Sequence, residues 1–103
     1  MTERELAANI EALCKYLGVS YYHTWTSRNS VAGWPDYCFV TADRRFLVRE
    51  LKTDKGKLTA AQETWLSALA AAGVDAAVWR SADWPDRIKA ELTPTRIAWN
   101  GCS

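Results

Sequence analysis

The amino-acid sequence predicts a small α/β (α+β) domain in which a central mixed β-sheet is flanked by helices. Three observations support this prediction: helix-type apolar spacing near the N-terminus, two adjacent β-rich segments in the middle, and an Ala-rich helix followed by a further β-rich segment. The expected element order is αβββαβ with one last helix. A length of 103 residues fits a single domain over residues 1–103.

The first helix is predicted over residues 2–17. Apolar side chains recur there at a spacing that places them on one helix face, namely Leu6, Ile10, Leu13 and Leu17. Thr2 and Glu5 fit a capping box at its start, and Gly18 fits its end. Residues 19–23 are rich in β-branched and aromatic side chains and are predicted to form a short strand.

A β-hairpin is predicted in the middle of the chain, after a polar loop over residues 24–35. Its strands are residues 36–41 and 46–52, separated by the turn-like ADRR. Both faces of each strand carry apolar side chains. The hairpin should therefore lie centrally in the sheet, with cover on both sides.

The C-terminal half predicts one more helix–strand–helix unit. Residues 60–72 form an Ala-rich helix that begins after Thr59 and ends at Gly73. Residues 75–79 are predicted to be a strand, and residues 82–92 a last helix.

Composition excludes several classes of protein. The net charge of +1 gives no overall attraction to nucleic acid, so binding would need a local basic cluster. The three cysteines have no CxxC or Cys/His spacing, so neither a zinc site nor a disulfide framework is expected. No segment reads as a signal peptide or membrane span. We expect a cytoplasmic protein with reduced thiols and no membrane partner.

Charged residues with catalytic potential lie on the two hairpin strands. Glu50 and Lys52 are two residues apart, so their side chains share one face, roughly 6.5 Å apart along the backbone. In an antiparallel hairpin, residues directly opposite each other share a face, and their residue numbers have a constant sum. Asp36 therefore shares the face of Glu50 only if that sum is even. This requires a hairpin loop of odd length, such as three or five residues, or a β-bulge. A turn other than a two-residue one is therefore predicted around Asp43.

Such a cluster supports phosphodiester chemistry. Two converging carboxylates bind a hard cation such as Mg²⁺, and a substrate phosphate can complete its coordination. The cation activates water and neutralises charge on the phosphate, while the ammonium of Lys52 can orient the water or stabilise the developing negative charge.

The run GWPD, with VRELKTDKGKLTAAQETWLSALAAAGVDAAVW further on, resembles the VRR-NUC type of the PD-(D/E)XK nuclease superfamily. The resemblance covers roughly residues 33–85. It implies a restriction-endonuclease-like core and Mg²⁺- or Mn²⁺-dependent endonucleolytic cleavage of DNA, often of branched forms such as Holliday junctions. By position, it makes Asp36 and Glu50 metal ligands, the Leu51 carbonyl a further ligand and Lys52 the catalytic lysine.

The N-terminal segment ERELAANIEALCKYLG also looks like the first helix of archaeal-type Holliday junction resolvases, in which an early glutamate completes the metal site. Glu3 is the favoured candidate because it extends the apolar stripe toward the interior. Glu11 is the second choice, and Glu5 is explained by the capping box with Thr2.

Several nearby residues have two possible roles. Gln62 either closes a capping box with Thr59 or, as the resemblance implies, supports the site, and the two roles are compatible. His23 is either a general base or a structural or DNA-contacting group, and the second role is favoured. Trp25 and Trp34 either stack on unpaired bases or pack on the core, whereas Trp65 and Trp79 are expected in the core.

Ser27, Arg28, Lys55 and Lys57 are candidate DNA-binding residues. The two lysines follow the Glu-x-Lys strand directly. Together with Arg28, Arg44, Arg45 and Arg49 they are candidates for a local basic patch that the net charge does not reveal.

Two functions from different classes fit these observations. The first is a metal-dependent endonuclease acting on branched DNA as a homodimer, with an interface in the region of Trp84, Ile97 and Trp99. The second is a non-catalytic nucleic-acid-binding or assembly module with a nuclease-like fold. The complete set of Asp36, Glu50 and Lys52 favours catalysis.

Overall fold

A computed structural model describes residues 1–24 and 31–94 of the chain. Its elements follow the predicted order, with one short 3-10 helix (η1) before the last helix. In chain order they are α1 (Glu3–Leu17), β1 (Ser20–His23), β2 (Tyr37–Val40), β3 (Phe46–Lys52), α2 (Ala60–Ala71), β4 (Asp75–Arg80), η1 (Ser81–Asp83) and α3 (Asp86–Leu92).

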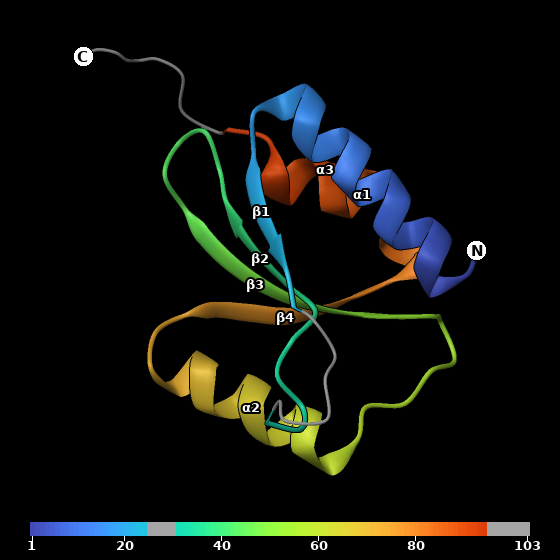
Figure 1. Cartoon of the computed structure of the whole chain (residues 1–103), viewed down its shortest axis with the longest axis vertical. Helices are drawn as coiled ribbons and strands as arrows, with labels where there is room; N and C mark the ends of the chain where they lie inside the picture. The colour runs from blue at the N-terminus through green and yellow to red at the C-terminus, as the bar shows by residue number, and fades with distance from the viewer. Residues whose placement is uncertain (25–30, 95–103) are drawn as a thin grey trace.

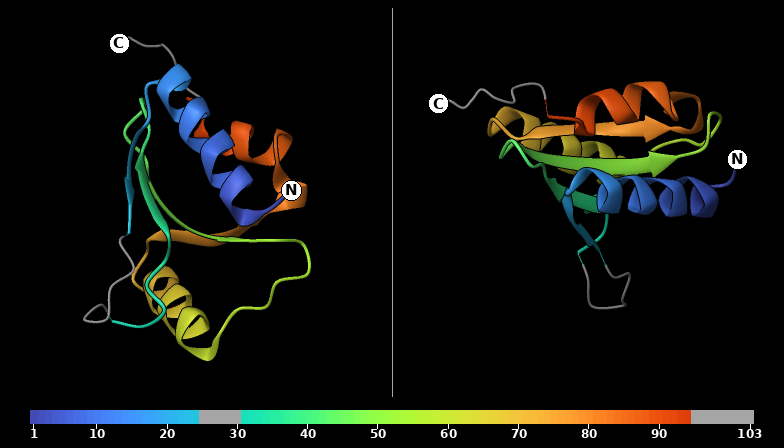
Figure 2. Two further views of the ribbon diagram at one scale, coloured as in Figure 1. Left: turned by 45° about the vertical axis from the view of Figure 1, so that its right-hand side comes forward. Right: turned by 90° about the horizontal axis from the view of Figure 1, so that it is seen from above.

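The four described strands form one mixed sheet in the order β1-β2-β3-β4. Strand β2 is antiparallel to both β1 and β3, and β4 is parallel to β3. Helices α1 and α3 lie together on one face of the sheet and α2 lies on the other (Figures 1 and 2). The predicted hairpin strands β2 and β3 are therefore central, as predicted. The predicted cover on both faces is confirmed for β3, whereas β2 leaves Val40 exposed on its α2 side.

Helix α1 begins and ends where the sequence predicts. The hydroxyl of Thr2 accepts a hydrogen bond from the Glu5 backbone, and the Glu5 carboxylate accepts one from the Thr2 backbone. Gly18 ends the helix in the left-handed conformation with φ of 72°, which glycine adopts without a steric penalty. Leu6, Ile10 and Cys14 of α1 are fully buried against the sheet.

The hydrophobic core lies between the sheet and the α1–α3 layer. Phe39, Leu47 and Trp79 contribute from the strands, and Ile88 and Leu92 from α3. This confirms that Trp79 is a core residue. No residue of α2 is fully buried, so the two faces of the sheet are covered very differently.

Trp65, expected in the core, lies only half-buried on α2. Its ring meets the edge of Trp34, with ring centroids 4.9 Å apart. Trp34 is thus packed against protein, one of its two predicted roles. Gly33, at φ of 90°, lets this loop approach the helix, because a Cβ there would lie 2.4 Å from the Ala61 carbonyl carbon.

The prediction of one helix over residues 82–92 is wrong at its start. The chain forms η1 first, and α3 begins only at Asp86. Pro85 explains the break, because proline disfavours helical backbone in the residue before it. Trp84 is accordingly extended, with φ of −94° and ψ of 135°.

The register of the β2–β3 hairpin determines which side chains share a face. Tyr37 is opposite Arg49, and Val40 is opposite Phe46. The numbers of paired residues therefore have an even sum, and the loop over residues 41–45 has an odd length. This confirms the predicted turn and places Asp36 in register with Glu50.

No helix in the described part of the chain is long and apolar enough to cross a membrane.

Candidate active site

Asp36 is held in place by both neighbouring strands. Its carbonyl accepts a hydrogen bond of 2.8 Å from the backbone of Thr24, just after β1. Its carboxylate accepts one of 2.9 Å from the backbone N–H of Leu51 on β3. The side chain therefore lies where β2 begins to separate from β3, at the end of the hairpin opposite its loop.

Glu50 and Lys52 lie on the same face of β3, toward α2. The Lys52 ammonium is 3.9 Å from a carboxylate oxygen of Glu50, and only 4% of the Glu50 side chain is exposed. The amide of Gln62, on α2, donates a hydrogen bond of 3.0 Å to the same carboxylate oxygen. Gln62 also forms the capping box with Thr59, so both contacts considered for it are present.

The environment of Glu50 favours its protonated form. The pKa of this carboxyl is raised to about 8: burial is the largest cause, the nearby carboxylate of Asp36 acts in the same direction, and Lys52 opposes both. Two carboxylates converge here, and Lys52 is the one cation beside them among the described residues. A divalent cation at this position would remove the repulsion between them.

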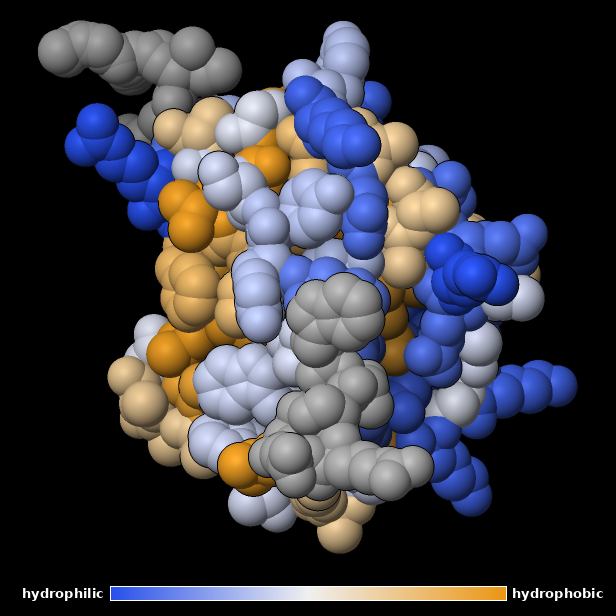
Figure 3. Space-filling view, viewed as in Figure 1, coloured by the Kyte–Doolittle hydropathy of each residue, from blue (hydrophilic) through white to orange (hydrophobic). Residues whose placement is uncertain are grey.

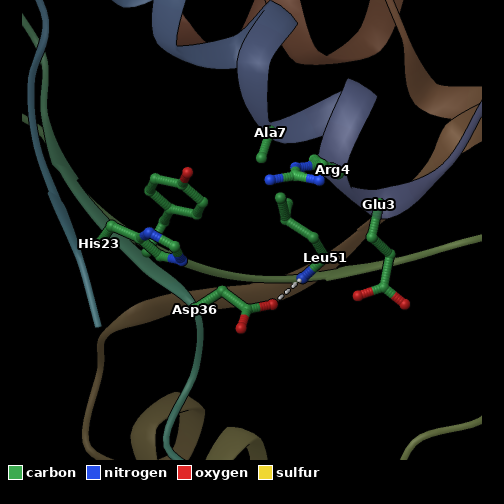
Figure 4. Close-up of a pocket in the computed structure, with 7 residues that line it drawn as sticks. Glu3, Arg4, Ala7, His23, Asp36 and Leu51 are labelled. Atoms are coloured by element: carbon green, nitrogen blue, oxygen red, sulfur yellow. Dashed lines mark hydrogen bonds between the residues drawn. The ribbon is translucent and has the colours of Figure 1, made fainter. Parts of the chain in front are cut away.

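A pocket of about 330 Å³ opens beside Asp36, toward α1. Arg4 and Ala7 reach it from α1, His23 borders it from β1, and Asp36 and Leu51 lie at its base (Figure 4). Glu3 and Tyr37 complete the lining. The site therefore has an open side on which a substrate group can lie next to Asp36.

The three candidate glutamates of α1 have different surroundings. Glu3 lines the pocket with Asp36 and lies on the far side of Leu51 (Figure 4). Glu11 instead accepts hydrogen bonds from the hydroxyls of Tyr21 and Tyr37, and Glu5 caps the helix. Glu3 is thus the only one of the three that lines the pocket with Asp36, and its role as a ligand stays a prediction.

The donor atoms at the site suit Mg²⁺. Within residues 1–24 and 31–94, no group of three or more His, Cys, Asp or Glu side chains is arranged to hold a metal. Asp36 and Glu50 supply two carboxylates, and the Leu51 carbonyl faces the Asp36 side because the N–H and C=O of a strand residue point to the same edge. One or two carboxylates completed by substrate phosphate and water is the usual Mg²⁺ arrangement in phosphate chemistry.

The loop after Lys52 is tied to β4 by a residue that the sequence reasoning missed. Arg80 is the parallel partner of Lys52, and its guanidinium donates hydrogen bonds of 2.8 Å to the Thr53 carbonyl and 2.6 Å to the Gly56 carbonyl. Asp54 accepts one of 2.7 Å from the backbone of Ala82. The available signal was an arginine directly after the strand predicted over residues 75–79.

Lys55 and Lys57 are exposed on this loop, where they can reach a phosphate backbone. Strongly hydrophilic side chains gather along the edge of the molecule where this loop lies, at the right in Figure 3. Ser27 and Arg28, the other predicted DNA contacts, lie outside the described residues, as does Trp25.

The wider basic patch predicted from the sequence is wrong. Arg49 is buried, where it binds the carboxylates of Asp75 and Glu91, each at 2.9 Å. Arg45 binds Asp43 and two carbonyls near the end of α3. Arg44 and Arg45 also lie in the 41–45 loop, at the opposite end of the hairpin from Asp36, roughly 17 Å away by strand rise.

The residues predicted to form a dimer interface are Trp84, Ile97 and Trp99, and the structure describes only the first of them. Trp84 is partly buried and packs against the core of its own chain. Ile97 and Trp99 lie outside the described residues. Other large apolar side chains of the described residues are more exposed than Trp84, for example Tyr16, Tyr22 and Phe46.

A mixed sheet with helices on both faces, carrying an Asp, a Glu-x-Lys pair and a supporting glutamine, defines a nuclease-like domain. Comparison with protein families agrees: residues 2–83 match the VRR-NUC domain. The chain belongs to the VRR-NUC family, a nuclease-like family. Membership of this family implies that the protein is a nuclease and that it binds DNA.

A solved structure described as a VRR_NUC domain protein has the same fold. The TM-score is 0.63 with 24% sequence identity, and the alignment covers 81% of this chain and 80% of the other. A comparison with curated proteins gave no match.

Proposed function

We propose that the protein is an endodeoxyribonuclease that hydrolyses phosphodiester bonds with Mg²⁺ or Mn²⁺, acting on Holliday junctions or other branched DNA. The observation that carries the proposal is the hairpin register. Tyr37 lies opposite Arg49, so the same register continued by one residue brings Asp36 toward Glu50, which has Lys52 beside it. Neither carboxylate has the charge balance that a purely structural position would give it.

Each residue has a distinct task in this proposal. The carboxylates of Asp36 and Glu50, with the Leu51 carbonyl, would hold the cation. A divalent cation supplies charge neutralisation at the phosphate and activation of water. Lys52 stabilises the negative charge that develops on the phosphate oxygens or orients the attacking water. Gln62 fixes the Glu50 carboxylate, so that its position is set before substrate arrives.

The described part of the chain has one such site. Cutting both strands of a four-way junction would therefore require two copies, and we propose a homodimer for that reaction.

The direct test is cleavage of a panel of linear, nicked, flapped and four-way DNA with Mg²⁺, Mn²⁺ or EDTA. We expect metal-dependent cleavage and losses on the order of 1,000-fold for Asp36→Asn and Lys52→Met. Matched controls are Glu63→Gln and Lys89→Met, which change exposed charges on α2 and α3. Cleavage that persists unchanged in the site variants would point to a contaminating nuclease.

Calorimetric titration with Mn²⁺ separates the enzyme from a non-catalytic module. We expect binding by the wild-type protein and loss of binding in Asp36→Asn. If the protein binds DNA without metal uptake and cuts no substrate of the panel, the module is the correct assignment.

A further inference from the structure

Part of the lining of the pocket beside Asp36 has no role in the phosphodiester chemistry proposed above, namely Arg4, His23 and Tyr37. Glu50 and Lys52 lie on the α2 face of the sheet, whereas Arg4, His23 and Tyr37 border the pocket on the α1 face. A volume of about 330 Å³ is at the lower end of the range for small-molecule pockets. It suits one nucleotide-sized group and is far too small for a duplex.

His23 provides a flat aromatic surface at the edge of this pocket. Its ring stacks on Tyr37, with centroids 4.5 Å apart and planes inclined by 8°. Tyr37 is 1% exposed, and its hydroxyl donates to Glu11, which also accepts from Tyr21. One face of the imidazole is thus packed on a fixed ring, while the residue itself is partly exposed to solvent.

Arg4 lies across the pocket from His23 (Figure 4). It is exposed and makes no hydrogen bond or ion pair with any other residue in the described part of the chain. A cation in the first turn of a helix is also disfavoured by the helix dipole. Helix stability therefore does not explain Arg4, whereas an exposed guanidinium in the same pocket as Asp36 is suited to bind a phosphate.

We propose that this pocket binds one unpaired nucleotide of a DNA strand, with its base stacked on His23 and its phosphate on Arg4. The proposal rests on the function proposed above and specifies its substrate. Inside a duplex both faces of a base are covered by neighbouring bases, so a base can lie on His23 only when it is unstacked. The enzyme should therefore favour DNA with unpaired nucleotides next to the cleaved bond, such as flaps, overhangs and open junctions.

The test is DNA binding measured by fluorescence anisotropy in EDTA, where metal-dependent cleavage does not occur. The two probes are a blunt duplex and a duplex of equal length with a five-nucleotide overhang. We expect the wild-type protein to prefer the overhang. His23→Ala should weaken overhang binding about tenfold, the effect of one lost base–aromatic stack, and change duplex binding less than about twofold.

Matched variants separate stacking from structural effects. His23→Phe should restore overhang binding, because it keeps a flat ring. Tyr22→Ala, which removes an exposed ring from the neighbouring position on the other face of β1, should leave binding unchanged. Arg4→Gln should weaken overhang binding and lower the salt dependence of the affinity by the equivalent of about one phosphate contact. Lys15→Gln, near the other end of α1, is the matched control and should change neither quantity.

The proposal is overturned if the wild-type protein shows no preference for the overhang. It is equally overturned if His23→Ala weakens both probes alike, or if His23→Phe does not restore binding. These results are independent of the catalytic test. Cleavage without overhang preference would refute only the nucleotide pocket, and overhang preference without cleavage would refute only the nuclease activity.

Discussion

Arg49 and Glu50 are adjacent on β3 and point to opposite faces of the sheet, into two very different charged environments. The Arg49 guanidinium lies between the carboxylates of Asp75 and Glu91, each 2.9 Å away, and 5.1 Å from the Trp79 ring centroid. Glu50 faces the like charge of Asp36, and the cation beside it, Lys52, is 3.9 Å away. In the first cluster both carboxylates contact the guanidinium directly, whereas in the second two carboxylates lie together beside an ammonium that is farther away.

The pKa shifts at the two clusters have opposite signs. Burial raises the pKa of Glu91, but hydrogen bonds from Arg49, Arg87 and Trp79 outweigh that effect and lower it overall. Burial and Asp36 raise the pKa of Glu50. Buried charges that serve stability are paired, so a buried cluster of like charge indicates a site prepared for an external cation or substrate.

Arg49→Met is expected to give the largest loss of stability in this comparison. The substitution keeps an apolar chain against Trp79 but leaves Glu91 and Asp75 without their cation. We expect a loss of about 3 kcal/mol in the free energy of unfolding, the low end for a broken buried pair because both carboxylates are partly exposed. Urea denaturation measures it, with Lys52→Met as the control expected to be near wild type. Equal stability of Arg49→Met and wild type would refute the structural role.

Glu50→Gln should have the opposite effect, and the effect should depend on pH. A carboxyl whose pKa is raised on folding, here from 4.5 to about 8, costs stability as the pH rises through that window, because the folded state resists its ionisation. The amide variant keeps an acceptor for Gln62 but cannot ionise. In EDTA its melting temperature should match wild type near pH 4 and exceed it by several degrees at about pH 9. A difference that does not change with pH would contradict the assignment.

Local patterns predicted most of the framework. Strand β3 has the predicted bounds, residues 46–52, and both capping boxes form at the expected residues. The odd hairpin loop could also be predicted, because side chains alternate along a strand and the chemistry needs Asp36 and Glu50 on one face. The split before α3 was signalled by Pro85, to which the helix prediction gave too little weight.

Contacts between distant segments could not be predicted. The partners of Arg49 come from β4 and α3, so its burial depends on how those elements pack. A strand arginine next to a Glu-x-Lys motif therefore reads equally as a DNA contact or a core ion pair. Arg80 shows the same limit, because its link to the 53–56 loop exists only through the parallel pairing of β3 with β4.

Arg80→Met should give the smallest effect, and one confined to turnover. Its guanidinium fixes the loop that directly follows Lys52, so its loss should loosen the position of the ammonium and lower kcat about tenfold. Mn²⁺ binding should be unchanged, because Asp36 and Glu50 keep their contacts. Arg80→Lys should recover part of the activity, since an ammonium can still donate to a loop carbonyl, and Arg87→Met, which removes an exposed arginine on α3, serves as the control. A kcat at the wild-type level in Arg80→Met would mean that Lys52 is held by β3 alone.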